Sequence, residues 1–120
     1  MILKKKEYDE TYHKRVTWWV EETEQHEALP LLNRGWGNGY AVVPKGHPLY
    51  EVESPYESGC DLDINSEITF AGWRQHYGRE YWVIGFDTAH YGDNILRWPK
   101  EAVQREAKIF AEQIKKTNVK

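Results

Sequence analysis

The sequence predicts one α+β domain, in which a twisted antiparallel sheet carries a C-terminal amphipathic helix on one face. Three observations support this fold class. The chain has 120 residues, a length that suits a single domain with one core. Short segments in its middle alternate apolar and polar residues between glycines and prolines, as strands do. The C-terminal segment instead repeats apolar residues at helical spacing. We therefore expect residues 1–120 to form one domain.

The first half of the chain predicts two strands. Alternating valine and tryptophan in RVTWWVEET favour a strand over residues 16–23, whereas residues 1–15 receive no assignment. The three glycines of GWGNG break any helix and predict a glycine-rich turn. The segment GYAVV then predicts a short strand, which ends at Pro44 in the turn PKGHP.

The middle of the chain predicts a loop followed by a hairpin. Residues 51–63 are rich in carboxylates but lack the spacing of a calcium loop, so we expect an exposed acidic loop. The segments DINSEITFAGW and YWVIGFDT both alternate, which predicts two strands. The turn GRE between them is short enough for an antiparallel hairpin.

The helix is expected over residues 99–117. Pro99 suits the first helical turn, and Glu101 near the start complements the helix dipole. Lys115 and Lys116 do the same near the end. The face expected to pack on the sheet consists of Val103, Ala107, Phe110 and Ile114.

Composition excludes several classes of protein. The net charge is −3, and the one basic block is Lys4, Lys5 and Lys6, so general nucleic-acid binding is disfavoured. Cys60 is the single cysteine, which excludes an internal disulfide and a cysteine-based zinc site. The sequence has no apolar run that resembles a signal peptide or a membrane span, so we expect a cytoplasmic protein that binds no membrane.

Polar and glycine residues gather near the expected strand ends in three places: residues 34–50, 65–69 and 87–93. Glycines let a ligand approach backbone N–H groups, cationic side chains neutralise an anion, and aromatic rings stack on a planar group. We therefore expect GFDTAHYGD to form one wall of a ligand pocket, with RGWGNGY and PKGHPLY as the other. The candidate ligand-binding residues are Arg34, Trp36, Tyr40, Lys45, His47, Tyr50, Thr69, Asp87, His90, Tyr91 and Asp93.

Other interpretations of these residues stay open. Asp87, His90 and Asp93 have the side chains of a metal site, but residues spaced by three need not converge in an extended or turning segment, and we expect neither a metal nor a cofactor. They can equally satisfy the backbone of an ordinary turn. Glu67 or Asp87 with a histidine could transfer protons, yet the sequence has no nucleophile elbow, Walker motif or zincin motif. The sequence thus favours a binding protein over an enzyme and assigns no catalytic residue.

Between residues 35 and 114 the chain carries, in this order, the segments GYAVVPKGHPLYE, ITFAG, WVIGFDTAHYGD and WPKEAVQREAKIFAEQI. Together they resemble a family of small, mostly uncharacterised bacteriophage and prophage proteins. Many of those relatives have a His-Gly-Gly triplet where this chain has Asn65, Ser66 and Glu67. The departure weakens an enzymatic interpretation that would need this histidine.

The resemblance implies a phage accessory protein that works in the cytoplasm of the bacterial host. Small aromatic-rich phage proteins include some that sequester nucleotide signals of bacterial immune systems, which is an analogy of context rather than of motif. The expected partner is therefore a small polar or nucleotide-like ligand, and a homo-oligomer stays open. The alternatives are a small hydrolase or metal-dependent enzyme using His47, Asp87 and His90, and an interaction module that inhibits a host enzyme.

Overall fold

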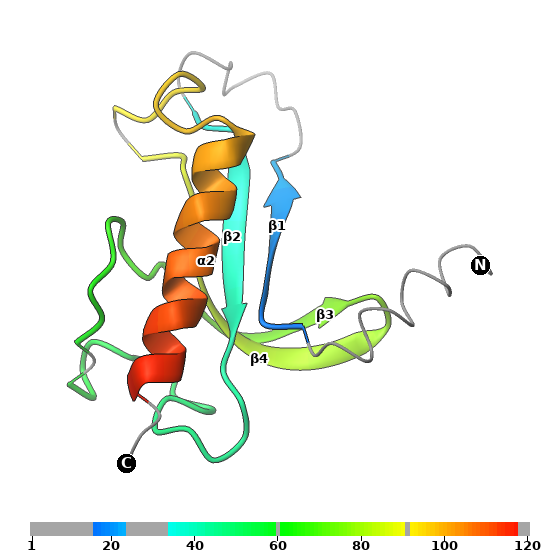
Figure 1. The fold of residues 1–120 in the computed structure, drawn as a ribbon, viewed down its shortest axis with the longest axis vertical. Coiled ribbons are helices and arrows are strands. Elements are labelled where there is room, and N and C mark those ends of the chain that lie inside the picture. The colour runs from blue at the N-terminus through cyan, green and yellow to red at the C-terminus, as the bar shows by residue number, and fades with distance from the viewer. Residues whose placement is uncertain (1–15, 24–33, 60, 91, 118–120) are drawn as a thin grey trace.

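The protein is a four-stranded antiparallel sheet with one helix packed on it, as the sequence predicts (Figure 1). The computed structural model describes residues 16–23, 34–59, 61–90 and 92–117. The strands lie in the order β1-β2-β4-β3, and all neighbours are antiparallel. The elements are β1 (Trp18–Glu22), β2 (Gly37–Val42), β3 (Phe70–His76), β4 (Arg79–Phe86) and α2 (Lys100–Thr117).

The predicted glycine-rich turn is wrong, because Gly37 and Gly39 lie inside strand β2. Both are glycines for reasons of space. A Cβ on Gly39 would lie 2.5 Å from the ring of Phe86 and 3.1 Å from Ala107, and one on Gly37 would collide with the backbone carbonyl of Glu21. The close approach that these glycines allow is therefore used by the protein's own strands and helix, not by a ligand.

The predicted hairpin is confirmed as β3 and β4, with a shift in the turn. The turn residues are Tyr77 and Gly78, which both have positive φ angles of 51° and 81°. Two such residues form the type of turn that matches the twist of antiparallel strands. Arg79 and Glu80, expected in the turn, are the first residues of β4.

The strand expected from residue 63 begins only at Phe70. The preceding segment is bound to the helix rather than to a neighbouring strand. The carboxylate of Glu106 accepts hydrogen bonds of 2.9 Å and 2.8 Å from the backbone N–H groups of Asn65 and Ser66, and it also binds both of their side chains. Because its backbone donors are satisfied there, this part of the segment forms no ladder.

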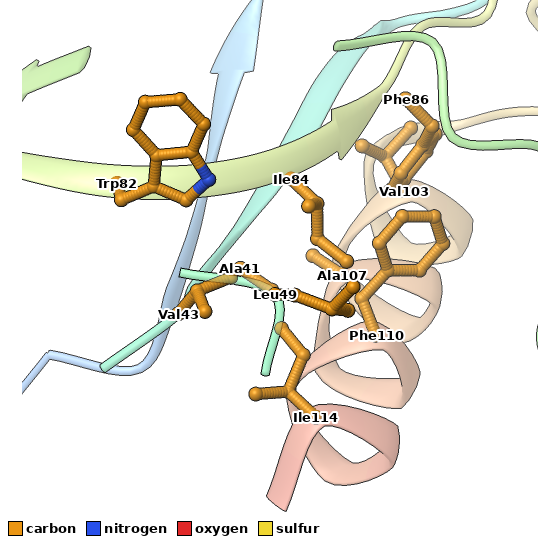
Figure 2. Packing of buried hydrophobic residues seen from close by; sticks show 10 residues of the cluster. All are labelled: Ala41, Val43, Leu49, Trp82, Ile84, Phe86, Val103, Ala107, Phe110 and Ile114. Atoms are coloured by element: carbon orange, nitrogen blue, oxygen red, sulfur yellow. The ribbon is translucent and has the colours of Figure 1, made fainter. Parts of the chain in front are cut away.

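The helix packs its predicted face on the sheet. Val103, Ala107 and Phe110 are completely buried, and Ile114 is nearly so. Figure 2 shows these side chains pointing toward those of Ile84, Phe86, Val43 and Leu49, which belong to the same core cluster. Within the described ranges, no helix has both the length and the apolar character that crossing a membrane requires. The acidic loop is mostly exposed, as expected.

The sheet curls so strongly that its two edge strands meet through their side chains. The hairpin of β3 and β4 crosses the end of β1 and β2 instead of extending a flat sheet (Figure 1). As a result, Arg74 of β3 forms an ion pair with Glu21 of β1. The ring centroids of Trp19 in β1 and His76 in β3 are 4.1 Å apart. This curl creates a second, concave face on the side of the sheet away from α2.

Candidate functional site

The predicted pocket is wrong for one of its walls: PKGHPLY lies at the other end of helix α2 from GFDTAHYGD, whereas the start of RGWGNGY does lie beside GFDTAHYGD. Thr88, within the GFDTAHYGD segment, lies near the start of the helix. Its carbonyl accepts a 2.6 Å hydrogen bond from Gly35 N–H, and the adjacent Trp36 N–H donates to the carbonyl of Trp98 at 2.8 Å. His47 instead binds the carbonyl of Ile114. At 1.5 Å of rise per residue, the two contacts are about 24 Å apart along the helix.

His47 is a structural residue. Only 4 % of its surface is exposed. Nε2 donates to the carbonyl of Ile114 at 2.8 Å, and Nδ1 accepts from the backbone N–H of Leu49 at 3.0 Å. The last carbonyls of a helix have no partner within the helix, so His47 caps α2 and anchors the PKGHP turn to it. Both ring nitrogens are occupied and neither faces a ligand.

Replacing His47 by alanine is therefore expected to lower the free energy of unfolding by about 2–3 kcal/mol, because two buried hydrogen bonds and ring packing are lost. Chemical denaturation measures this loss. His90→Ala is the matched control, since His90 is exposed, and should change stability by less than about 0.5 kcal/mol. Equal losses in both variants would contradict the capping role.

The GFDTAHYGD segment closes on itself as a turn. His90 Nδ1 lies 3.2 Å from Asp87 Oδ1 and 3.6 Å from Asp93 Oδ2. The same carboxylates accept from backbone N–H groups, Asp87 from Ala89 and Asp93 from His90. The described residues contain no group of three or more histidines, cysteines or acids arranged to hold a metal ion. This geometry matches the alternative of a turn whose polar side chains satisfy its own backbone.

Other predicted ligand residues have structural partners. Arg34 is buried, and its guanidinium donates to the carbonyl of Gly35 at 2.8 Å. Trp36 packs partly against the main core, and the Lys100 ammonium lies 5.5 Å from its ring centroid. These contacts join the start of β2 to the start of α2. Arg34 and Trp36 therefore have structural roles that require no ligand.

The remaining predicted residues are dispersed. Lys45 is exposed in the PKGHP turn, far from the GFDTAHYGD segment. Tyr50 contacts the edge of Trp73, with ring centroids 6.0 Å apart. Thr69 donates its backbone N–H to Gly85 just before β3. Tyr91 lies outside the described residues. Asp87, His90 and Asp93 do lie together in their own turn, and Asp87 also lies near Tyr40 on one surface of the sheet.

That surface is the concave face. Its base is a small buried cluster of Trp19, Tyr40 and Val83, against which Phe70 and Tyr81 pack. Tyr40 covers Gly85, where a Cβ would lie 2.6 Å from the tyrosine ring. Partly exposed polar side chains surround this base. We define the concave face by Trp19, Glu21, Tyr40, Phe70, Arg74, His76, Tyr81, Val83 and Asp87.

Arg74 is the central charged group of the concave face. Its guanidinium binds Glu21 through Nε and one terminal nitrogen, and its carbon lies 4.6 Å from the ring centroid of Tyr40. The other terminal nitrogen makes no hydrogen bond within the described part of the chain. The side chain remains 38 % exposed. Arg74 is thus fixed in position yet can still donate hydrogen bonds to a bound anion.

The ionisable groups of this face influence one another. Burial alone raises the pKa of Glu21, but hydrogen bonds from Arg74 and Trp19 together with the charge of Arg74 outweigh it and hold that pKa below its usual value. The hydrogen bond to Glu21 raises the pKa of Arg74. Burial raises the pKa of Tyr40, to which the charge of Asp87 also contributes. Perturbed groups of this kind cluster at functional sites, although structural ion pairs produce them too.

His76 is a further titratable group of this face whose pKa is shifted by burial. Its ring stacks on Trp19 with an angle of 13° between the planes. Burial lowers the pKa of His76, and the charge of Glu21 opposes this only in part. The neutral imidazole is therefore the form that fits the folded protein. With Arg74 and the aromatic base, it makes a polar platform at the seam between the two edge strands.

No family model matches the chain, and no curated protein or solved structure does. The resemblance to phage proteins therefore stays a prediction, and the geometry of the concave face is the basis for the candidate site.

Acidification is expected to destabilise the protein through His76. The unfolded histidine titrates near its ordinary pKa of 6.5, whereas the folded pKa is lower. The unfolded chain thus binds the proton first, so the stability is complete above about pH 6.5 and is lost as the pH falls through the folded pKa. Denaturation at a series of pH values measures this loss. His76→Phe keeps a ring on Trp19 and should make the free energy of unfolding less dependent on pH between pH 7 and 5 (about the histidine range). The same pH dependence in the variant and the wild type would contradict this role of His76.

Sequence reasoning missed Glu21, Arg74 and His76. Alternation within β3 does place Phe70, Arg74 and His76 on one face, and this signal is readable from the sequence. Nothing in the sequence says that the first strand of the sheet meets the third through Glu21, because that contact depends on how far the sheet curls.

Proposed function

We propose that the protein binds a small planar anion on the concave face and releases it unchanged. The observation that supports this most is the position of Arg74, which is held by Glu21 and Tyr40 while its side chain stays 38 % exposed and its other terminal nitrogen has no hydrogen bond to the described residues. A cation fixed beside aromatic rings suits a ligand that combines a negative charge with a flat ring system.

A nucleotide-derived ligand fits this chemistry. Its phosphate would receive hydrogen bonds from Arg74, and its base would lie against the exposed edges of Phe70 and Tyr81. Asp87 at the border of the face would accept from a sugar hydroxyl. In the phage context that the sequence resemblance implies, sequestration of a nucleotide signal is the most concrete form of this proposal.

Binding without turnover is favoured over catalysis. The acid and the histidine at the centre of the concave face both serve other groups of the protein: Glu21 binds Arg74 and Trp19, and His76 stacks on Trp19. The enzyme alternative based on His47, Asp87 and His90 has lost its basis, because His47 lies at the other end of α2.

The test is calorimetric titration with a panel of nucleoside monophosphates and cyclic dinucleotides, followed by chromatography of the recovered ligand. At least one should bind and be recovered intact. Arg74→Gln should weaken its binding by about tenfold or more, the effect of removing a charged hydrogen bond.

Arg105→Gln is the matched control, because Arg105 is an exposed arginine on α2. It should leave the affinity within about twofold of the wild type, since exposed charges at a distance are screened. If Arg74→Gln and Arg105→Gln weakened binding equally, the ligand would not bind at the concave face. Conversion of the ligand into a product would show that the protein is an enzyme and not a binding protein.

A further inference from the structure

Strand β3 has an open outer edge. The N–H of Val43 donates to the carbonyl of Trp82, which fixes the alternation along β4: Trp82 and Ile84 bond to β2, and Val83 bonds to β3. In β3, the residues paired with β4 in this way are Phe70, Gly72, Arg74 and His76. The backbone groups of Ala71, Trp73 and Gln75 therefore point away from the sheet, and no strand of the described chain pairs with them.

The start of this edge is hollowed. A cavity of about 280 Å³ lies where β3 begins beside the 53–57 loop, and its lining includes Glu53, Tyr56, Glu57 and Ala71. Tyr56 is held there because its hydroxyl accepts the backbone N–H of Ile68 at 2.9 Å. The edge is also apolar, since Tyr56 is 55 % exposed and Trp73 is 46 % exposed. Exposed aromatic rings beside an unpaired strand edge are a typical peptide-binding arrangement.

Charge identifies the kind of peptide. Between Lys45 and Arg74 the sequence has six carboxylates and neither a lysine nor an arginine. Two of these carboxylates, Glu53 and Glu57, line the cavity itself. The local field therefore favours a cationic segment and disfavours an acidic one.

We propose that the outer edge of β3 binds an extended, lysine- or arginine-containing segment of another protein as an additional strand. The backbone of that segment would pair with Ala71, Trp73 and Gln75. One of its apolar side chains would enter the cavity, and a neighbouring cationic side chain would lie against Glu53 and Glu57. Phe70 borders both this cavity and the concave face, but the backbone groups and carboxylates proposed to bind the segment belong to the edge alone. The peptide proposal can therefore be tested independently of the proposed ligand.

The test uses two blocked synthetic peptides on the full chain, one alternating lysine with valine and one alternating glutamate with valine. Hydrogen exchange reports the site directly. The lysine peptide should bind with a dissociation constant below about 1 mM. It should slow exchange of the Ala71, Trp73 and Gln75 amides, while the outward amides at the β1 edge stay unchanged.

Two variants separate backbone pairing from charge. Gln75→Pro removes one outward N–H without removing a ladder bond and should abolish the protection. The pair Glu53→Gln and Glu57→Gln should weaken binding by about 3- to 10-fold. The matched pair Glu101→Gln and Glu112→Gln on exposed positions of α2 should have less than a twofold effect (about the screened limit).

Several results would overturn the proposal. Failure of the lysine peptide to bind at about 1 mM would do so, as would equal binding of the glutamate peptide. Protection located at the β1 edge would show that the wrong edge was chosen. If the outward β3 amides became more protected from hydrogen exchange as the protein concentration rose, with no peptide present, the occupant of the edge would be a second copy of the chain.

Discussion

Phe110→Ala is expected to lower the free energy of unfolding by about 3–5 kcal/mol, the range for truncating a buried phenylalanine. Phe110 has no exposed surface and lies at the centre of the helix–sheet core. Its ring centroid is 5.0 Å from that of Phe86, which in turn occupies the space left by Gly39. The loss combines apolar surface, the ring contact and a cavity that a rigid sheet fills only partly. Urea denaturation with linear extrapolation measures it.

The control is Lys108→Ala on the same helix. Lys108 is exposed, and alanine keeps the helix propensity, so the change should stay within about 0.5 kcal/mol. A loss below about 0.5 kcal/mol for Phe110→Ala itself would mean that this helix face is not the one that packs on the sheet.

Glu106→Ala should cost about 2–4 kcal/mol. Only 2 % of the surface of Glu106 is exposed, and its carboxylate accepts four hydrogen bonds from Asn65 and Ser66. Hydrogen bonds to a charged group contribute more than neutral ones, and their loss leaves two backbone donors without partners. The segment before β3 should detach from the helix, which hydrogen exchange at Asn65 and Ser66 would detect.

Glu106→Gln refines this prediction. A glutamine keeps the shape, but its amide would place a donor against donors of Asn65 or Ser66. Its cost should be smaller than that of alanine yet above about 1 kcal/mol. Glu101→Gln, in the first turn and exposed, is the matched control and should be nearly neutral. Equal stability of the Gln variant and the wild type would contradict the acceptor role of Glu106.

The sequence predicted the elements that depend on local pattern. The face of α2 was readable because Val103, Ala107, Phe110 and Ile114 follow helical spacing, and the β3–β4 hairpin because its two strands are close in sequence. The strand expected from residue 63 failed for a long-range reason: Glu106, on the helix, binds the backbone that would otherwise extend the ladder.

The candidate site was less predictable than the fold. Glycine, histidine and aspartate in loops suggested a pocket, but His47 caps a helix and Gly39 makes room for Phe86. Turns contain the same types of residue whether those residues bind a ligand or form hydrogen bonds with the backbone of the turn. The concave face needs β1 and β3 to meet, and that depends on the curl of the whole sheet, for which a single sequence carries no local signal.

The most direct test of the central claim is a ¹H–¹⁵N NMR titration with the nucleotide that binds best. The indole N–H of Trp19 donates to Glu21 at 2.9 Å, so its resonance reports the concave face. We expect this resonance and the Arg74 Nε–H resonance to shift in proportion to occupancy, while the indoles of Trp36 and Trp98 stay unchanged. Saturable shifts confined to Trp36, Trp98 or the turn from Asp87 to Asp93 would contradict a ligand site on the concave face.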